Sequence, residues 1–347
     1  MARTKYGKYV TREIIAESKY SAITTPVARY NGCRGGGDAL TCEWSCITKP
    51  FTMDQEPEVD NERDRFLLFG GTNLDDGKDF SAEIELPLGA RGEKQIITGP
   101  TCVYLPKGLK HGPVKFKSIG KPITCLSVSL SPRYSVGWAP DNESKCLAKV
   151  GDLPPEFTVK TDGPPDVTAI HPPDIPFRYL RQPLGKGLNY FLWSRQLGFP
   201  ASISWSVGTV FYRDYFYVEP VHAHRRSHQV SMFLGGNPLD IEDFDGEVDI
   251  FMGKELEKHT IDSCAVDHYV PGIPHLGDER RRVGKPFLHI MWVIGPEMND
   301  YYAAAPTDKV LLSDESKGEV MIPKGAADYV PPIPLDEWVW PYPEEQK

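Results

Sequence analysis

The sequence has no excess of positive charge and no long apolar run. It contains 39 Lys and Arg against 48 Asp and Glu, which gives a formal net charge of −9. Because no basic stripe with interleaved aromatic residues occurs, nucleic acid and anionic membrane surfaces are not expected partners. No apolar stretch is long enough to span a bilayer, and residues 1–9 lack the apolar core of a secretory signal. We therefore predict a soluble, cytoplasmic protein whose partner is a small molecule.

The sequence also lacks a cysteine framework. Its seven cysteines are scattered, and no Cys-x-x-Cys pair occurs. Cys42 and Cys46 are four residues apart, but no downstream pair has the spacing of a zinc finger. We therefore expect reduced, structural thiols in a reducing compartment.

Proline and glycine, in contrast, are abundant. The 32 Pro and 31 Gly separate short runs rich in Val, Ile, Tyr, Phe and Thr, a pattern typical of strands joined by tight turns. A chain of 347 residues suits two domains of roughly 150 residues each. We predict an all-β protein with two domains.

An internal repeat supports this division. The segments FGGTNLDD at 69–76 and LGGNPLDI at 234–241 match at an offset of 165 residues, and later landmarks, including His111 and His275, match at 164. Each half contains four predicted strands, at 65–69, 83–86, 102–105 and 123–129, then at 230–234, 247–251, 266–270 and 287–293. A proline-rich stretch at 151–176 reads as a linker, so we place the domain boundary near residue 165.

Histidines in the second half have the spacing of metal ligands. Side chains on a strand alternate between its two faces, so His222 and His224 point the same way and can share one ion. Gln229 follows closely, and His275 lies about fifty residues downstream. Three imidazoles and one amide oxygen can hold a transition metal with coordination positions left open.

These residues carry a resemblance to the cupins. A cupin has the motif His-x-His, three or four residues, Glu, six residues, Gly, and a second motif built around Pro-x-Gly-x-x-His. Here His222-Ala223-His224 is followed after four residues by Gln229 in place of Glu, and 270–275 reads VPGIPH. In the first half, 106–111 reads PKGLKH, while the first motif is missing. The chain thus resembles a bicupin over residues 50–130 and 205–295, which implies a double-stranded β-helix, or jelly roll, in each half.

The two copies differ where the metal would bind. At the offset of 165, His222 and His224 correspond to Pro57 and Val59, Gln229 corresponds to Asp64, and only His111 remains. We therefore predict a metal-free, structural domain at 1–165 and a metal-binding domain at 166–347.

The sequence offers three candidates for the fourth metal ligand, Gln229, His228 and Glu247. Gln229 is a weaker donor than a carboxylate, and His228 is a competitor because only one of two adjacent strand residues can point inward. Glu247, at the start of a predicted strand, is the other candidate, either as a ligand or as a general base beside the metal. Its counterpart Glu83 argues equally for a structural role. We expect His259 and His268 to be strand or surface residues; the face on which His289 lies is left open, with the barrel interior as one alternative.

Two further features suggest partners. Arginines beside the histidines, foremost Arg225 and Arg280, could bind a carboxylate, so an acidic or phenolic substrate is expected; a role as solvated turn residues is equally open. The segment 329–343, rich in Pro, Trp and Tyr, predicts an extended arm that packs on a neighbouring domain or on another subunit of a homo-oligomer.

The ligand set predicts a divalent transition metal. Fe(II) is the expected ion, and Zn, Mn, Ni and Cu remain open. Open positions allow O2 to bind beside an organic ligand, so we predict an oxygenase that cleaves a C–C bond in a small acidic or phenolic compound. The alternatives are a non-oxidative lyase, decarboxylase or isomerase, and a non-catalytic metal- or ligand-binding bicupin.

Overall fold

The computed structural model contains strands and a few short 3-10 helices, η1 (Gly7–Tyr9), η3 (Pro132–Tyr134) and η4 (Glu143–Cys146). It confirms the all-β prediction. No helix among the described residues is long and apolar enough to cross a membrane. The structure describes residues 4–24, 26–32, 39–53, 62–73, 79–137, 143–149, 190–193, 203–211, 222–224, 227–253, 255–295 and 301–303.

The first barrel consists of two antiparallel sheets. Its inner sheet contains, in spatial order, β12 (Leu147–Lys149), β9 (Thr101–Leu105), β6 (Arg65–Gly71), β11 (Ile123–Leu130), β4 (Leu40–Ile47), β3 (Val27–Asn31) and β2 (Ile15–Ala16). Its outer sheet contains β5 (Phe51–Met53), β10 (Val114–Ile119), β7 (Ala82–Leu88) and β8 (Glu93–Ile97).

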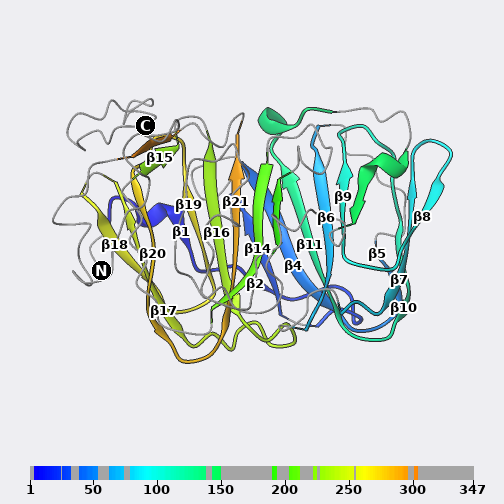
Figure 1. The fold of residues 1–347 in the computed structure, drawn as a ribbon, viewed down its shortest axis with the longest axis horizontal. Coiled ribbons are helices and arrows are strands. Elements are labelled where there is room, and N and C mark those ends of the chain that lie inside the picture. The colour runs from blue at the N-terminus through cyan, green and yellow to red at the C-terminus, as the bar shows by residue number, and fades with distance from the viewer. Residues whose placement is uncertain are drawn as a thin grey trace, which may run out of the picture.

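The second barrel repeats this arrangement. Its inner sheet contains β1 (Val10–Thr11), β19 (Ala265–Tyr269), β16 (His228–Gly235), β21 (Phe287–Ile294), β14 (Ile203–Phe211) and β13 (Tyr190–Trp193). Its outer sheet contains β18 (Glu257–Ile261), β17 (Gly246–Met252), β20 (His275–Val283), β15 (His222–His224) and β22 (Tyr301–Ala303). Figure 1 shows the barrels side by side, with the two outer sheets at opposite ends of the molecule.

The strand order in each barrel is that of a jelly roll. In the first barrel the order β4-β11-β6-β9 faces β5-β10-β7-β8, and in the second β14-β21-β16-β19 faces β15-β20-β17-β18. Eight strands that pass between two sheets in this sequence form two interlocked Greek keys. The prediction of two tandem jelly-roll barrels is confirmed, and each of the eight predicted strands lies within or overlaps an observed one.

The central strands are buried on both faces, which explains why they read as almost unbroken apolar runs. On β6, Phe66 and Leu68 join a core shared by both barrels, while Leu67 and Phe69 fill the first barrel. The second barrel adds Met232 and Trp292, among others, to the shared core. The inner sheets therefore pack against each other over a common hydrophobic layer.

The cysteines behave as predicted where they are described. Six of them, all but Cys33, are buried, and none of these six is in a disulfide. Burial raises the pKa of the Cys102 thiol to about 12, so this thiol stays protonated. Four of the six, Cys42, Cys46, Cys102 and Cys125, lie on strands of the first barrel's inner sheet.

The N-terminal segment crosses to the second barrel. Strand β1 pairs with β19, and Tyr6 is buried in the second barrel's own core. The side chain of Lys5 binds Glu255 at 3.0 Å. Strand β2 then returns to the inner sheet of the first barrel. The start of the predicted domain 1–165 thus packs on the other domain, while the boundary near 165 lies outside the described residues.

The strand ladders give the two halves a constant separation of 164 residues, and this corrects the sequence alignment. Arg65 pairs with one residue on each side, Ser129 and Leu105, and the residues 164 positions later pair identically, namely Gln229 with Val293 and Tyr269. The glycine motif, matched at 165, had equated Gln229 with Asp64. The segment from Ile47 to Arg65 spans 18 residues, and so does the matching segment from Phe211 to Gln229. The counterparts of His222 and His224 therefore change from Pro57 and Val59 to Glu58 and Asp60. Both of these residues lie outside the described part of the chain.

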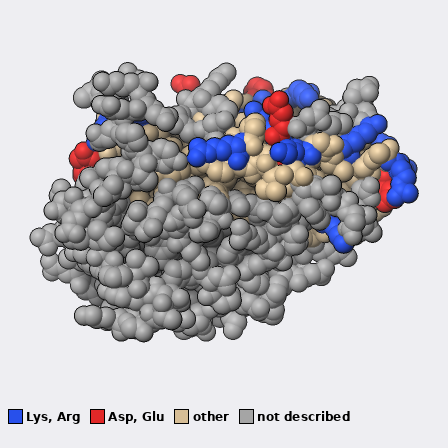
Figure 2. Space-filling view, turned by 90° about the horizontal axis from the view of Figure 1, so that it is seen from above, with Lys and Arg blue, Asp and Glu red and all other residues tan. Residues whose placement is uncertain are grey.

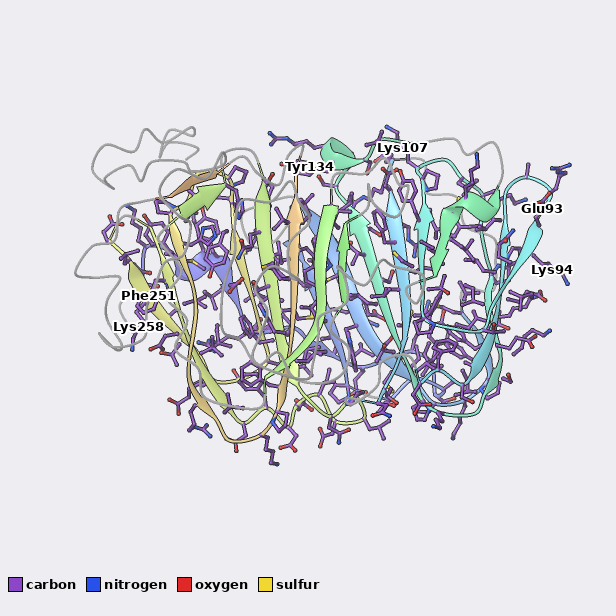
Figure 3. The ribbon with its side chains drawn as sticks, in the orientation of Figure 1. Glu93, Lys94, Lys107, Tyr134, Phe251 and Lys258 are labelled. Carbon is purple, nitrogen blue, oxygen red and sulfur yellow. The ribbon has the colours of Figure 1, made fainter. Side chains whose placement is uncertain are left out.

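A polar chain crosses the contact between the barrels. The phenol of Tyr30, on β3, lies 2.8 Å from Nδ1 of His268, and Nε2 of His268 lies 2.9 Å from Nδ1 of His228. Tyr134 packs its ring edge-on against His228, and Figure 3 shows Tyr134 at the junction of the barrels. Burial lowers the pKa of His268 to about 4. Burial, together with the nearby His268 and Arg133, lowers the pKa of His228 to about 2.

Acidification should therefore weaken this contact. Above the unfolded pKa of about 6.5, His268 is neutral in both states and the full stability of the fold is present. As the pH falls from there toward about 4, the unfolded state takes up a proton that the folded state does not, and the free energy of unfolding decreases. The difference between the unfolded and folded pKa values of His268 corresponds to about 3 kcal/mol in the free energy of unfolding. Urea denaturation of the protein and of the variant His268→Gln, at about pH 7 and about pH 4.5, measures it. Equal pH dependence in both proteins would contradict the assignment to His268.

Candidate metal centre

Three strands of the second barrel bring the predicted ligands to one end of its interior. Strand β15 carries His222 and His224, and its backbone pairs with β20 through the register His222 to His275. Gln229 lies on β16, in the opposing inner sheet. The side chain of His222 is outside the described residues, while those of His224 and His275 are buried.

The side chain of Gln229 lies between two imidazoles. Its Oε1 is 3.0 Å from Nε2 of His224 and 3.3 Å from Nε2 of His275. The two rings have centroids 5.5 Å apart. The described side chains alone contain no group of three His, Cys, Asp or Glu placed to hold a metal. The structure thus brings together three of the four predicted ligands.

The orientation of His275 is fixed from two sides. Its Nδ1 donates to the carbonyl of Ile273 at 3.0 Å, which leaves the lone pair of Nε2 directed at Gln229. The ring of Tyr269 stacks on the imidazole with centroids 4.1 Å apart. Tyr269 in turn donates to the carboxylate of Asp267 at 3.3 Å. A metal-ligating histidine is commonly held in this way.

The donor atoms have the spacing that a metal requires. A metal-to-ligand distance of about 2.1 Å places neighbouring donors about 3.0 Å apart in an octahedral site and about 3.4 Å apart in a tetrahedral one. The observed distances from Gln229 to His224 and His275 match this range. An amide oxygen and an imidazole nitrogen that both present lone pairs repel each other unless a proton or a cation lies between them. The residues present therefore fit a bound divalent metal.

The structure resolves the competition between Gln229 and His228. Neighbouring strand residues face opposite sides, and His228 points to His268 and the contact between the barrels. His289 faces the interior of the second barrel, where it stacks on Phe233 at 4.7 Å. His268 lies on strand β19, one of its two expected placements, and is buried between the barrels.

Glu247 does not reach the histidines. It lies near the start of β17, whereas the β17 residue that pairs with His275 is Met252, at the strand's far end. The Glu247 carboxylate accepts a hydrogen bond from Nε of Arg282 at 3.1 Å, and 42% of its side chain is exposed. Because a long-range ion pair holds it at the surface, Glu247 is not retained as a ligand or base.

The predicted substrate arginines are described only in part. The side chains of Arg225 and Arg280 lie outside the described residues, as does the arm at 329–343. Arg282 binds Asp245 and Glu247 instead of the histidines. In Figure 2 the described Lys and Arg side chains lie mainly in the centre and on the right, the side of the first barrel in Figure 1, with Asp and Glu side chains among them.

Sequence reasoning missed the residues that support His275. Tyr269 and Asp267 alternate on β19 and face the same side of the strand, and the backbone N–H of Ser231 donates to Asp267 at 3.0 Å. The sequence of 265–269 does place Asp267 and Tyr269 on one face of a strand. That this face contacts His275 could be seen only in the structure.

The first barrel has a related pair at the equivalent place. His111 directs Nδ1 at the carbonyl of Leu109, 2.9 Å away, as His275 does with Ile273. Nη1 of Arg65 donates to Nε2 of His111 at 3.2 Å. An arginine therefore stands where the second barrel has Gln229.

No protein-family model and no curated protein matches the sequence. Among solved structures, a variant of oxalate decarboxylase from Bacillus subtilis has a TM-score of 0.47 and 10% identity, covering 84% of this chain and 78% of that chain. Vicilin from hazelnut, Corylus avellana, has a TM-score of 0.48 and 9% identity, covering 85% and 88%. AerE from Microcystis aeruginosa has a TM-score of 0.48 and 7% identity, covering 83% and 100%. Similarity at this level carries no information about the reaction, and the jelly-roll assignment rests on the strand order.

Proposed function

We propose that the chain is a two-domain cupin and that its second barrel holds a divalent metal through His222, His224, Gln229 and His275. One observation supports this most strongly. Nε2 atoms from two different strands, at His224 and His275, converge on the amide oxygen of Gln229 at distances typical of neighbouring metal ligands.

The ligand set bears on the choice of metal and substrate. All four proposed ligands are neutral, so the ion keeps its full double charge and attracts an anion. Three imidazoles and an amide suit Fe(II), which we propose as the ion; Zn, Mn, Ni or Cu would bind the same donors. Such a charge favours a small acidic or phenolic substrate.

The chain's own residues orient and enclose the site. The Ile273 carbonyl binds Nδ1 of His275 and the Tyr269 ring stacks on the imidazole, so that Nε2 points inward toward Gln229. Val293 pairs with Gln229 across the inner sheet, is buried, and supplies an apolar wall. When bound, the metal would polarise a chelating anionic substrate and offer a position for O2.

We propose an oxygenase reaction that cleaves a C–C bond. The placement of Glu247 favours it, because the acid considered as a general base is held at the surface by Arg282. Oxidation of an anionic substrate by O2 does not require a protein carboxylate to abstract a proton, whereas an isomerase commonly does. A lyase or decarboxylase would use the same metal without O2.

Oxygen-electrode assays test the proposal. Fe(II)-loaded protein, screened against small phenolic acids and β-diketones, should consume O2 in step with substrate loss. The variant His224→Gln should lose this activity, while His259→Gln, altered in the same barrel but away from the site, should keep it. Turnover that continues without O2 would favour the lyase, decarboxylase or isomerase. Bound metal without turnover of any substrate would favour a binding protein.

A further inference from the structure

We propose that Arg65 is a built-in cation, whose guanidinium replaces the metal in the first barrel, so that the pair Arg65 and Gln229 determines which barrel binds a metal. The inference rests on the metal site proposed for the second barrel. It assigns a role to a residue pair, Arg65 and His111, that the proposed function does not use.

Arg65 and Gln229 occupy the same position in the two jelly rolls. Each is fixed by two independent ladders, one to the strand on either side, and all three paired positions differ by 164 residues. Both side chains point into their own barrel, as shown by their contacts with His111 and His275. The comparison is therefore between matched sites and does not depend on sequence similarity.

The histidine partner is also the same in both barrels. His111 and His275 each use Nδ1 to bind the carbonyl two residues earlier, at 2.9 and 3.0 Å, and each presents Nε2 to the inner sheet. In the first barrel a donor, Nη1 of Arg65, meets that nitrogen at 3.2 Å. In the second barrel an acceptor, Oε1 of Gln229, meets it at 3.3 Å.

The nature of this contact separates the two sites. A guanidinium carries a permanent charge and only donors, so it satisfies the lone pair of His111 without an ion. An amide oxygen offers no proton to His275, whereas a cation from solution can bind the amide oxygen and the imidazole nitrogen at once. A metal entering the first barrel would have to displace Arg65 from His111 against the repulsion of like charges.

The exchange Gln229→Arg tests the proposal. Elemental analysis should give about one metal equivalent for the natural protein and less than about a tenth for this variant. Adding a chelator should lower the melting temperature of the natural protein but leave that of Gln229→Arg unchanged and close to that of the metal-bound natural protein. Gln229→Met, which removes the amide oxygen without supplying a cation, is the control; with chelator present it should melt as low as the chelated natural protein.

Two results for Gln229→Arg would overturn the inference. If this variant still binds an equivalent of metal, a guanidinium does not exclude the ion. If it is metal-free but melts as low as Gln229→Met, the guanidinium does not replace the ion. A natural protein without metal would instead defeat the proposed function, so the two failures are distinguishable.

The reverse change keeps the inference testable if Gln229→Arg does not fold. In protein with 15N-labelled histidine, Mn²⁺ should broaden the signals of His275 but not those of His111. In Arg65→Gln the His111 signals should broaden as well, while in Arg65→Lys, which keeps the charge, they should not. His111 signals that stay sharp in Arg65→Gln would overturn the role of Arg65.

Discussion

Replacing His275 by alanine should reduce the bound metal from about one equivalent to less than about a tenth, and turnover should fall to the background rate. His275 is buried, its Nδ1 is committed to the Ile273 carbonyl, and its Nε2 faces Gln229. Removing the imidazole leaves a cavity beside Tyr269 and takes away one of the three nitrogen donors. Elemental analysis of protein purified without a metal-affinity tag measures the loss.

A second substitution separates metal loss from unfolding. His275→Gln keeps most of the side-chain volume and should also lose the metal, while its fold, judged by circular dichroism, persists. His289→Gln is the matched control, because His289 faces the interior of the same barrel but stacks on Phe233. Metal retained in His275→Gln, or lost equally in His289→Gln, would contradict the assignment of His275 as a ligand.

Replacing Asp64 by alanine should lower the free energy of unfolding by about 3 to 5 kcal/mol. The Asp64 side chain is fully buried and accepts hydrogen bonds from four groups, the Tyr104 hydroxyl and the backbone N–H groups of Lys107, Val136 and Gly137. Alanine leaves these donors without an acceptor. The carboxylate also anchors the segment that carries Tyr134, whose ring packs on His228, so the contact between the barrels weakens too.

Urea denaturation measures this cost. Asp79→Ala is the control, because that carboxylate lies nearer the surface in an ion pair with Lys121 at 2.8 Å, and its loss should cost much less than that of Asp64. Asp64→Asn, which keeps one acceptor oxygen, should fall between the two. A cost for Asp64→Ala no larger than that for Asp79→Ala would show that the four hydrogen bonds contribute little.

Local patterns in the sequence predicted the architecture well. Short runs of β-forming residues and the turn residues between them located eight strands, and the repeat implied two equivalent barrels. The cupin motifs grouped His222, His224 and His275; the structure brings His224 and His275 together at Gln229, while the side chain of His222 lies outside the described residues. The resemblance to cupins then predicted the jelly roll that the strand order shows.

Features that depend on long-range pairing were missed. The Glu247 carboxylate could not be excluded from the site without Arg282, 35 residues away, which holds it at the surface. The crossing of β1 to β19 leaves no pattern in a segment of two residues. The glycine motif aligned the repeats one residue out of register, and a slip of one residue exchanges the two faces of a strand. Because of that slip, the sequence alignment matched Gln229 to Asp64 and not to Arg65.

The two barrels share one fold but differ in the group that faces the histidine Nε2 at the inner sheet. In each, a histidine whose Nδ1 binds a carbonyl presents Nε2 to the inner sheet, and Arg65 donates to that nitrogen in the first barrel. We infer that the second barrel recruits a metal for the same purpose and thereby gains a reactive centre. The first barrel then serves to cover the shared hydrophobic layer.

The most direct test of this account is an anomalous-scattering map from crystals of protein grown with Fe(II) under anaerobic conditions. It should show one strong peak among His222, His224, Gln229 and His275, with metal-to-ligand distances of about 2.0 to 2.3 Å, and none between Arg65 and His111. A map without a peak at the histidines, or with an equal peak beside His111, would contradict it.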